Sequence, residues 1–176
     1  TNSYAFCTED MKEELLYQIK LTNNLFRVLD NKELVLYYQP QVNTHSGEII
    51  GAEALLRWFH PVHGLIMPGL FIPLAENTGL INSIGDWVLA EACRQCKDWH
   101  NKGKLIRMAV NVSSIQLRNS DFVDRVKKIL EDTELEPEYL ELELTESAAV
   151  KNSEHIIDTL RQLKEMGVSI SIDDFG

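Results

Sequence analysis

Hydrophobic residues follow two spacings that alternate along the chain. Apolar residues recur every three or four positions over 10–30, 68–76 and 82–100 and in two later stretches, and this spacing predicts helices. The later helices begin after caps at Ser120 or Asp121 and at Asn152 or Ser153. The last helix is expected to turn its apolar side chains inward, namely Ile156, Ile157, Leu160 and Leu163. Continuous or alternating apolar runs predict strands over 34–42, 48–58, 107–112, 139–145 and 168–172.

The order of these elements indicates the fold class. The strands over 34–42 and 48–58 are joined by a short turn, which predicts an antiparallel hairpin. From 107 onward strands alternate with amphipathic helices, and this alternation is typical of a parallel sheet built by right-handed crossovers. We therefore expect an α/β fold, a TIM-like (β/α) barrel with an antiparallel first strand. Since such barrels need about 250 residues, we expect the chain to stop after about the fifth strand.

Composition narrows the function classes. The formal net charge of -10 argues against electrostatic binding of DNA or RNA, which requires a basic face. The sequence has no apolar run long enough to span a membrane and no signal peptide, so we expect a cytoplasmic location, with any membrane anchor in upstream domains of a longer parent. Cys7, Cys93 and Cys96 do not make a disulfide framework. The pair Cys93 and Cys96 on a predicted helix indicates packing more than zinc or redox chemistry.

The strand over 48–58 carries the first candidate chemistry. Glu53, Leu55 and Arg57 share one face of it, because side chains two positions apart in a strand point the same way. A carboxylate and a guanidinium on one face can hold a cation and a phosphate side by side. The alternative is a partly exposed ion pair with no further role.

Further carboxylate and amide groups fall near the carboxyl ends of the other predicted strands. The full set is Glu53, Asn111, Glu143, Glu146, Asp173 and Asp174. In a parallel β/α barrel these ends meet at one face, where active sites are built. Oxygen-rich sets of this kind suit Mg²⁺ or Mn²⁺, and the adjacent aspartates suit a pair of metals. Taken singly, each residue is as readily a solvated side chain or a helix cap, as Asn111 illustrates.

These residues lie in motifs that resemble the EAL-domain phosphodiesterases of cyclic di-GMP. The motifs, in order, are Tyr38-Gln39-Pro40, Glu53-Ala54-Leu55-Leu56-Arg57-Trp58, Phe71-Ile72-Pro73-Leu74-Ala75-Glu76, Asn111-Val112-Ser113, Glu143-Leu144-Thr145-Glu146 and Asp173-Asp174-Phe175-Gly176. Their order and spacing together are highly specific. The resemblance covers about residues 25–176.

The resemblance implies a role for each matching residue. Glu53, Asn111, Glu143 and Asp173 match metal ligands, and Asp174 matches a ligand of the second metal. Glu53 and Glu146 match catalytic positions, Glu146 being the glutamate that steadies the loop after the aspartate pair. Gln39, Leu55 and Arg57 match the substrate-binding side, with Arg57 on a substrate phosphate.

The implied reaction is metal-assisted hydrolysis of one phosphodiester bond of cyclic di-GMP to linear pGpG, with Mg²⁺ or Mn²⁺ at a two-metal site. The alternative is a catalytically inactive EAL-type receptor that keeps the nucleotide pocket, and a third interpretation is a fragment without a retained site. The implied partners are cyclic di-GMP, a second copy in a homodimer of the full-length parent, and upstream GGDEF or sensory domains in cis.

The resemblance also suggests domain boundaries. Residues 1–10 resemble the tail of a GGDEF domain, and 11–176 correspond to an EAL domain that is incomplete at its C-terminus. The lysine, later glutamates and final glutamine of the family lie beyond Gly176. We therefore expect the 176-residue polypeptide, made alone, to be inactive and to associate through open sheet edges.

Overall fold

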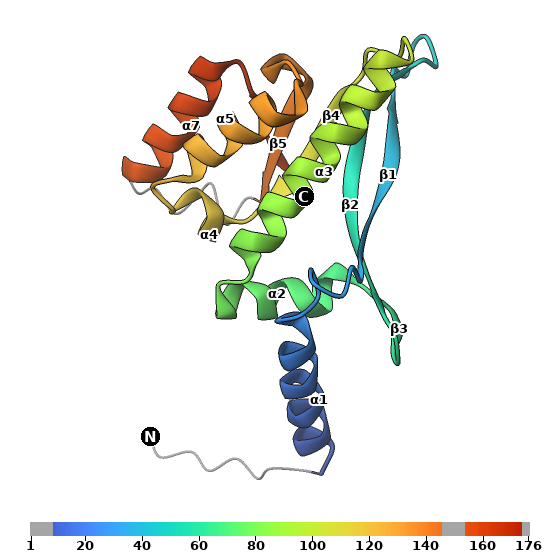
Figure 1. Ribbon diagram of the computed structural model, residues 1–176, viewed down its shortest axis with the longest axis vertical. Helices are drawn as coiled ribbons and strands as arrows, with labels where there is room; N and C mark the ends of the chain where they lie inside the picture. Colours follow the sequence, from blue (N-terminus) through green and yellow to red (C-terminus); the bar gives the residue numbers. More distant parts are fainter. Residues whose placement is uncertain (1–8, 146–153, 174–176) are drawn as a thin grey trace.

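A single mixed sheet organises the molecule (Figure 1). The structure is a computed structural model that describes residues 9–145 and 154–173. In this part of the chain the strands run in the order β1-β2-β4-β5-β6, and β3 pairs with β2. Their bounds are β1 Leu34–Val42, β2 Ile49–His60, β3 Gly64–Ile66, β4 Arg107–Val112, β5 Leu140–Thr145 and β6 Ser169–Asp173.

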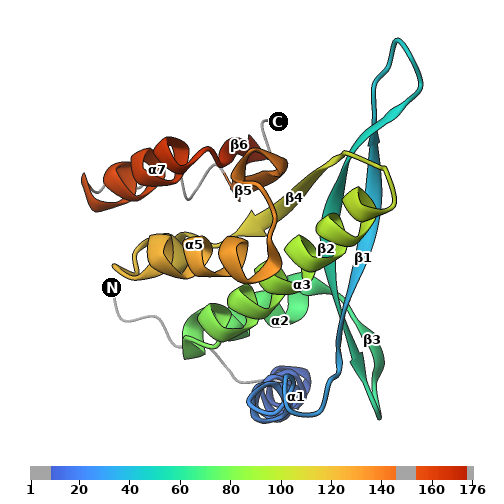
Figure 2. The same cartoon turned by 45° about the horizontal axis from the view of Figure 1, so that its top comes forward.

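The strand directions match the expected barrel. β1 and β2 are antiparallel, whereas β2, β4, β5 and β6 pair in parallel. The helices that connect them are α1 Glu9–Leu25, α2 Pro68–Thr78, α3 Ile81–Asn101, α4 Ser114–Leu117, α5 Phe122–Thr133, the 3-10 turn Pro137–Tyr139 and α7 Glu154–Met166. Figure 2 shows α3, α5 and α7 on the same side of the sheet. The α/β, TIM-like architecture with an antiparallel first strand is therefore confirmed.

Burial alternates along the strands and separates the two faces of the sheet. In β2, the side chains of Ala54, Leu56 and Trp58 are buried toward the helices, with Trp58 packed edge-to-face on Phe71 of α2 at 5.5 Å. Burying each large apolar side chain contributes about 1.5–3 kcal/mol. Because alternate side chains of each strand pack into this apolar layer, the side chains between them point to the other face of the sheet, which is where polar groups can lie.

Several predicted elements differ from the structure. The first helix ends at Leu25 and not near residue 30, and Leu15, Leu16 and Ile19 of its apolar stripe are exposed, because Leu21 and Leu25 face the core. Ile157 of α7, predicted to point inward, is 46% exposed. The helical spacing identifies an apolar stripe but not how much of it a neighbour covers.

The hydrophobic pattern of the sequence does not predict three short elements. They are β3, α4 and the 3-10 turn, which have too few residues to show a period. The predicted cap Asp121 does precede α5, but its carboxylate pairs with Arg125 instead of capping the helix. The predicted caps Asn152 and Ser153 lie outside the described residues. No helix in the described ranges has the length and apolar character needed to cross a lipid bilayer.

Candidate active site

The central contact of the site joins β2 to β4. Asn111 Nδ2 donates a hydrogen bond to Glu53 Oε1 at 2.7 Å. Glu53 stands near the end of the parallel ladder, which runs from Gly51 to Ala54 on β2. It is therefore at the end of this ladder and not at the end of β2, which continues to His60. Asn111 is a strand residue and not a helix cap, so the capping alternative for it is wrong.

The register extends this face across the next two strands. Asn111 pairs with Glu143 of β5, and Glu143 pairs with Ser171 of β6. Paired residues in neighbouring strands share a face, so Glu53, Asn111 and Glu143 line the side of the sheet opposite the helices. Asp173 lies two positions beyond Ser171, at the end of β6.

Part of the predicted metal site falls outside the described part of the chain. Glu146, Asp174 and the side chain of Asp173 lie outside the described residues. Among the residues that are described, no three His, Cys, Asp or Glu side chains form a metal-binding group. The described part of the face thus brings two carboxylates together with one carboxamide between them.

These three side chains have the chemistry that a hard divalent cation requires. Carboxylate and amide oxygens are the usual ligands of Mg²⁺ and Mn²⁺. The NH₂ group of Asn111 is directed at Glu53, and a half-turn of the carboxamide would present its oxygen there instead. The donor set therefore fits a divalent cation.

The predicted substrate-binding residues lie on the same face of β1 and β2. Gln39 pairs with Glu53 across the hairpin, and Leu55 pairs with Tyr37. The Arg57 guanidinium lies 5.8 Å from the centre of the Tyr37 ring and donates to the Leu56 carbonyl at 2.8 Å. These contacts hold a half-buried cation on the face of β2 that also carries Glu53, where it can meet a phosphate.

A cavity of about 240 Å³ opens at the same end of the sheet. Its lining includes Leu55, Arg57, Ile72, Gly85, Asn111 and Ser113. An apolar concavity with a few polar groups at its edge is typical of small-molecule sites. The cavity adjoins both the candidate phosphate-binding arginine and the candidate metal ligand.

A second set of polar residues supports the end of β4. The Ser113 hydroxyl donates to Glu76 Oε1 of α2 and accepts from the Ile115 amide at 3.2 Å. The Ser113 amide donates to Gln116 Oε1 at 3.0 Å, which completes a capping box for α4. In the sequence Glu76 and Ser113 stand out only as motif members, although the Ser-x-x-Gln spacing is a usable sign of the capping box.

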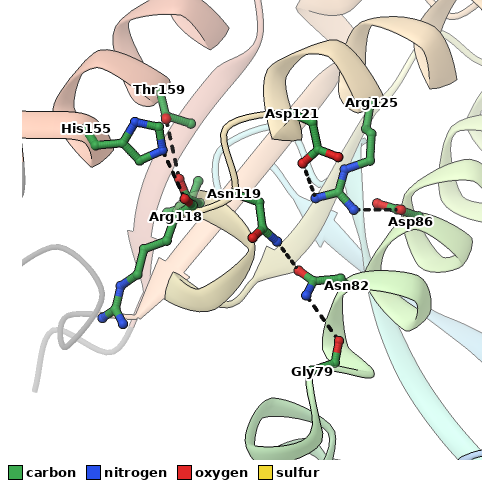
Figure 3. A network of polar contacts seen from close by, with 10 residues as sticks. Gly79, Asn82, Asp86, Arg118, Asn119, Asp121, Arg125, His155 and Thr159 are labelled. Carbon is green, nitrogen blue, oxygen red and sulfur yellow. Dashed lines mark hydrogen bonds and ion pairs between the residues drawn. The ribbon is translucent and has the colours of Figure 1, made fainter.

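A polar network surrounds the loop between α4 and α5, residues 118–121 (Figure 3). Asn119 donates to Asn82, and Arg125 of α5 pairs with Asp86 of α3 at 2.9 Å. On the other side, His155 Nε2 of α7 lies 3.0 Å from the Arg118 carbonyl. The loop after α4 is thereby tied to α3 and α7.

The cysteines of α3 take no part in the site. Cys93 and Cys96 are both fully buried and free. Burial raises the pKa of the Cys93 thiol to about 12 and that of Cys96 to about 11. Both groups are therefore neutral thiols at pH 7, as expected for packing residues.

Comparison with known proteins places this arrangement in a family. The family model described as EAL domain matches residues 22–176. The bifunctional diguanylate cyclase/cyclic di-GMP phosphodiesterase MucR of Pseudomonas aeruginosa is 48% identical over 176 residues, which are 99% of this chain and 26% of MucR. Cyclic di-GMP phosphodiesterase PdeR of Escherichia coli is 38% identical over 173 residues, 97% of this chain and 26% of PdeR. The chain thus spans about a quarter of the length of these relatives.

Solved structures give the same result. The complex of the PaMucR phosphodiesterase with c-di-GMP superposes with a TM-score of 0.86 at 51% identity, over 89% of this chain and 64% of that one. The EAL enzyme Bd1971 in its cAMP- and cyclic-di-GMP-bound form follows with a TM-score of 0.83 at 39% identity, over 93% and 46%. The family match covers most of the chain and coincides with the sheet that carries Glu53, Asn111 and Glu143. The chain belongs to the EAL domain family.

Proposed function

We propose that the protein containing this chain is a cyclic-di-GMP phosphodiesterase that uses Mg²⁺ or Mn²⁺ and releases linear pGpG. The observation that carries the proposal is the hydrogen bond between Asn111 and Glu53, in register with Glu143 and on the same face as Arg57. The names of the relatives MucR and PdeR support the substrate. The oxygen-rich set of side chains supports the cation, and the resemblance to the family implies the product pGpG.

Each residue has a defined task in this scheme. Glu53, Asn111, Glu143 and Asp173 would hold one cation, and Asp174 would be a ligand of the second. When bound, the cations supply positive charge that stabilises the phosphoryl oxygens and makes water a stronger acid. Arg57 binds a phosphate oxygen through its planar fork of donors, and the contact with Tyr37 limits its rotamers. Gln39 of β1 and Leu55 of β2 line the nucleotide site, and Glu146 steadies the loop after Asp174.

The chemical balance follows from the product. Linear pGpG carries a 5′ phosphate, so water attacks phosphorus, the P–O3′ bond breaks and a proton moves to the 3′ oxygen. Hydrolysis in ¹⁸O-labelled water should therefore place the label on the 5′ phosphate of pGpG. Label on the 3′ hydroxyl would contradict this route.

The decisive experiment compares Glu53→Ala with Glu48→Ala in the full-length protein. Both variants remove one carboxylate from the same hairpin, but Glu48 is exposed next to the turn, away from the β2–β4 ladder. We expect Glu53→Ala to lose cyclic-di-GMP hydrolysis with an unchanged circular dichroism spectrum, and Glu48→Ala to retain it. Equal hydrolysis in both variants would contradict the proposal. Binding of cyclic di-GMP by the wild type without any turnover in Mn²⁺ would instead identify a receptor.

The assembly of the protein completes the proposal. The homodimer is implied by the resemblance to the family alone, whereas an upstream GGDEF or sensory domain fits the length of the relatives MucR and PdeR, of which this chain spans about a quarter. Light scattering of the full-length protein tests the first point.

A further inference from the structure

The last residues of β4 are paired with only one of its two neighbouring strands. Pairing of β4 with β2 stops at Val110, whereas pairing with β5 continues to Val112. Asn111, the residue that binds Glu53, therefore has a ladder partner on the β5 side only. A side chain that must present an oxygen to a cation needs its backbone fixed on both sides.

The Glu76–Ser113 hydrogen bond supplies a restraint on the helix α2 side. The single hydroxyl proton of Ser113 is donated to the Glu76 carboxylate, and its lone pair accepts from the Ile115 amide. Hydrogen bonds to a carboxylate are about twice as strong as neutral ones. The bond joins residues 37 positions apart and fixes where the chain turns after Val112.

A second restraint comes from α3. The Gln116 side chain, 2% exposed, accepts from the Ser113 amide and packs against Gly85. Ser113 is thus held through its hydroxyl by α2 and through its amide by a residue seated on α3. The capping box of α4 consists of Ser113 and Gln116. The hydrogen bond from Ser113 to Glu76 is therefore additional to the box.

We propose that Glu76 is a positioning residue that acts through Ser113 to orient Asn111 toward the cation shared with Glu53. This inference rests on the proposed function. Glu76 itself contacts neither the cation nor the substrate in this scheme. Because its role is to accept one hydrogen bond, a glutamine at this position can replace it and an alanine cannot.

The test is calorimetric titration of Mn²⁺ into the full-length protein, without substrate. We expect Glu76→Ala to weaken Mn²⁺ binding about tenfold, the lower end for loss of an indirect support of a metal ligand. Glu76→Gln should stay close to the wild type. Asn77→Ala, an exposed neighbour on α2, and Asp98→Ala, which removes a charge far from the loop, serve as controls.

The double variant decides between direct and indirect action. If Glu76 works through Ser113, Glu76→Ala/Ser113→Ala binds Mn²⁺ as weakly as Ser113→Ala alone. Fully additive losses, or unchanged affinity in Glu76→Ala, would overturn the positioning role. If Glu76→Ala does not fold, Glu76→Gln and Ser113→Ala can be compared instead. Action through Ser113 predicts that Ser113→Ala loses Mn²⁺ affinity and Glu76→Gln does not, whereas direct binding of the cation by the Glu76 carboxylate predicts a loss in Glu76→Gln. Absence of both Mn²⁺ binding and hydrolysis in the wild type would overturn the proposed function instead.

Discussion

Asn111 and Glu53 lie 58 positions apart, and the carboxamide of the first donates to the carboxylate of the second at 2.7 Å. The contact requires β2 and β4 to be neighbours, which in turn requires the crossover through α2 and α3. A hydrogen bond to an ionised group stabilises a fold by about 1.5–3 kcal/mol. Without a cation, this bond offsets the cost of placing a carboxylate on the face it shares with Glu143.

Replacing the amide at this position should make stability depend on metal. Asn111→Asp removes the donor and sets a third carboxylate beside Glu53 and Glu143, so in EDTA we expect unfolding to become easier by about 1.5 kcal/mol. Added Mn²⁺ should recover the loss, because three carboxylates bind a cation more tightly than two. Thermal unfolding with EDTA and with Mn²⁺ measures both effects.

A swapped variant controls for the change of charge. Glu53→Gln/Asn111→Asp keeps one carboxylate and one amide, so its melting temperature in EDTA should match the wild type. An Asn111→Asp protein that is as stable as the wild type in EDTA would show that the two side chains are not coupled.

Arg57 should contribute to ligand affinity more than to the fold. We expect Arg57→Ala to weaken cyclic-di-GMP binding by about 1.5–3 kcal/mol, the range for a hydrogen bond to a charged group. Arg57→Lys should recover only part, because lysine keeps the charge but loses the planar fork. Calorimetric titration checks this, with Arg94→Ala as a control that removes an exposed arginine of α3. Unchanged affinity in Arg57→Ala would remove this residue from the site.

The common face of Glu53, Leu55 and Arg57 could be predicted from sequence because it follows from the period of a strand. The approach of Asn111 to Glu53 needed only the alternation of strands and helices, which fixes β2 and β4 as parallel neighbours. The Glu76–Ser113 bond could not be predicted, since it depends on how α2 lies over the end of β4. No spacing in the sequence encodes that crossing. The exposure of Ile157 could not be predicted either, because the helical spacing does not show which part of the apolar stripe of α7 a neighbouring element covers.

Alkaline pH should destabilise the protein through its buried thiols. Burial raises the pKa of Cys93 from 9.0 to about 12 and of Cys96 from 9.0 to about 11. The unfolded chain therefore loses these protons first as pH rises above 9, and stability falls until the folded thiols also ionise. The slope is at most about 1.4 kcal/mol per pH unit for each thiol.

Urea unfolding between pH 8 and 11 tests the thiol contribution. The Cys93→Ala/Cys96→Ala variant should be less stable at pH 8, because it loses packing, but should show a shallower decline above pH 9. A decline as steep as that of the wild type would assign the alkaline effect to other groups, such as Tyr38, whose pKa burial raises to about 12.

The Gln116 side chain packs against Gly85 of α3, so replacing this glycine should have two opposing effects on the free energy of unfolding. Alanine in a helix is favoured over glycine by about 1 kcal/mol, so Gly85→Ala gains that amount from the backbone. A methyl group at Gly85 would, however, lie 2.7 Å from Gln116 Cδ and closer still to its amide nitrogen. Displacing this buried amide costs about 1–3 kcal/mol in strain and leaves the Ser113 amide without its acceptor, at about the same further cost.

The unfavourable terms are larger, and we expect Gly85→Ala to lower the free energy of unfolding by about 1–5 kcal/mol. Gly69→Ala in α2 is the matched control, because its new methyl group would meet no atom within 4 Å. Its urea midpoint should be unchanged or higher. Adding Gln116→Ala to Gly85→Ala removes the clash, so the double variant should lose less than the sum of the single changes. A Gly85→Ala midpoint at or above that of the wild type would mean that Gln116 does not need its place against α3.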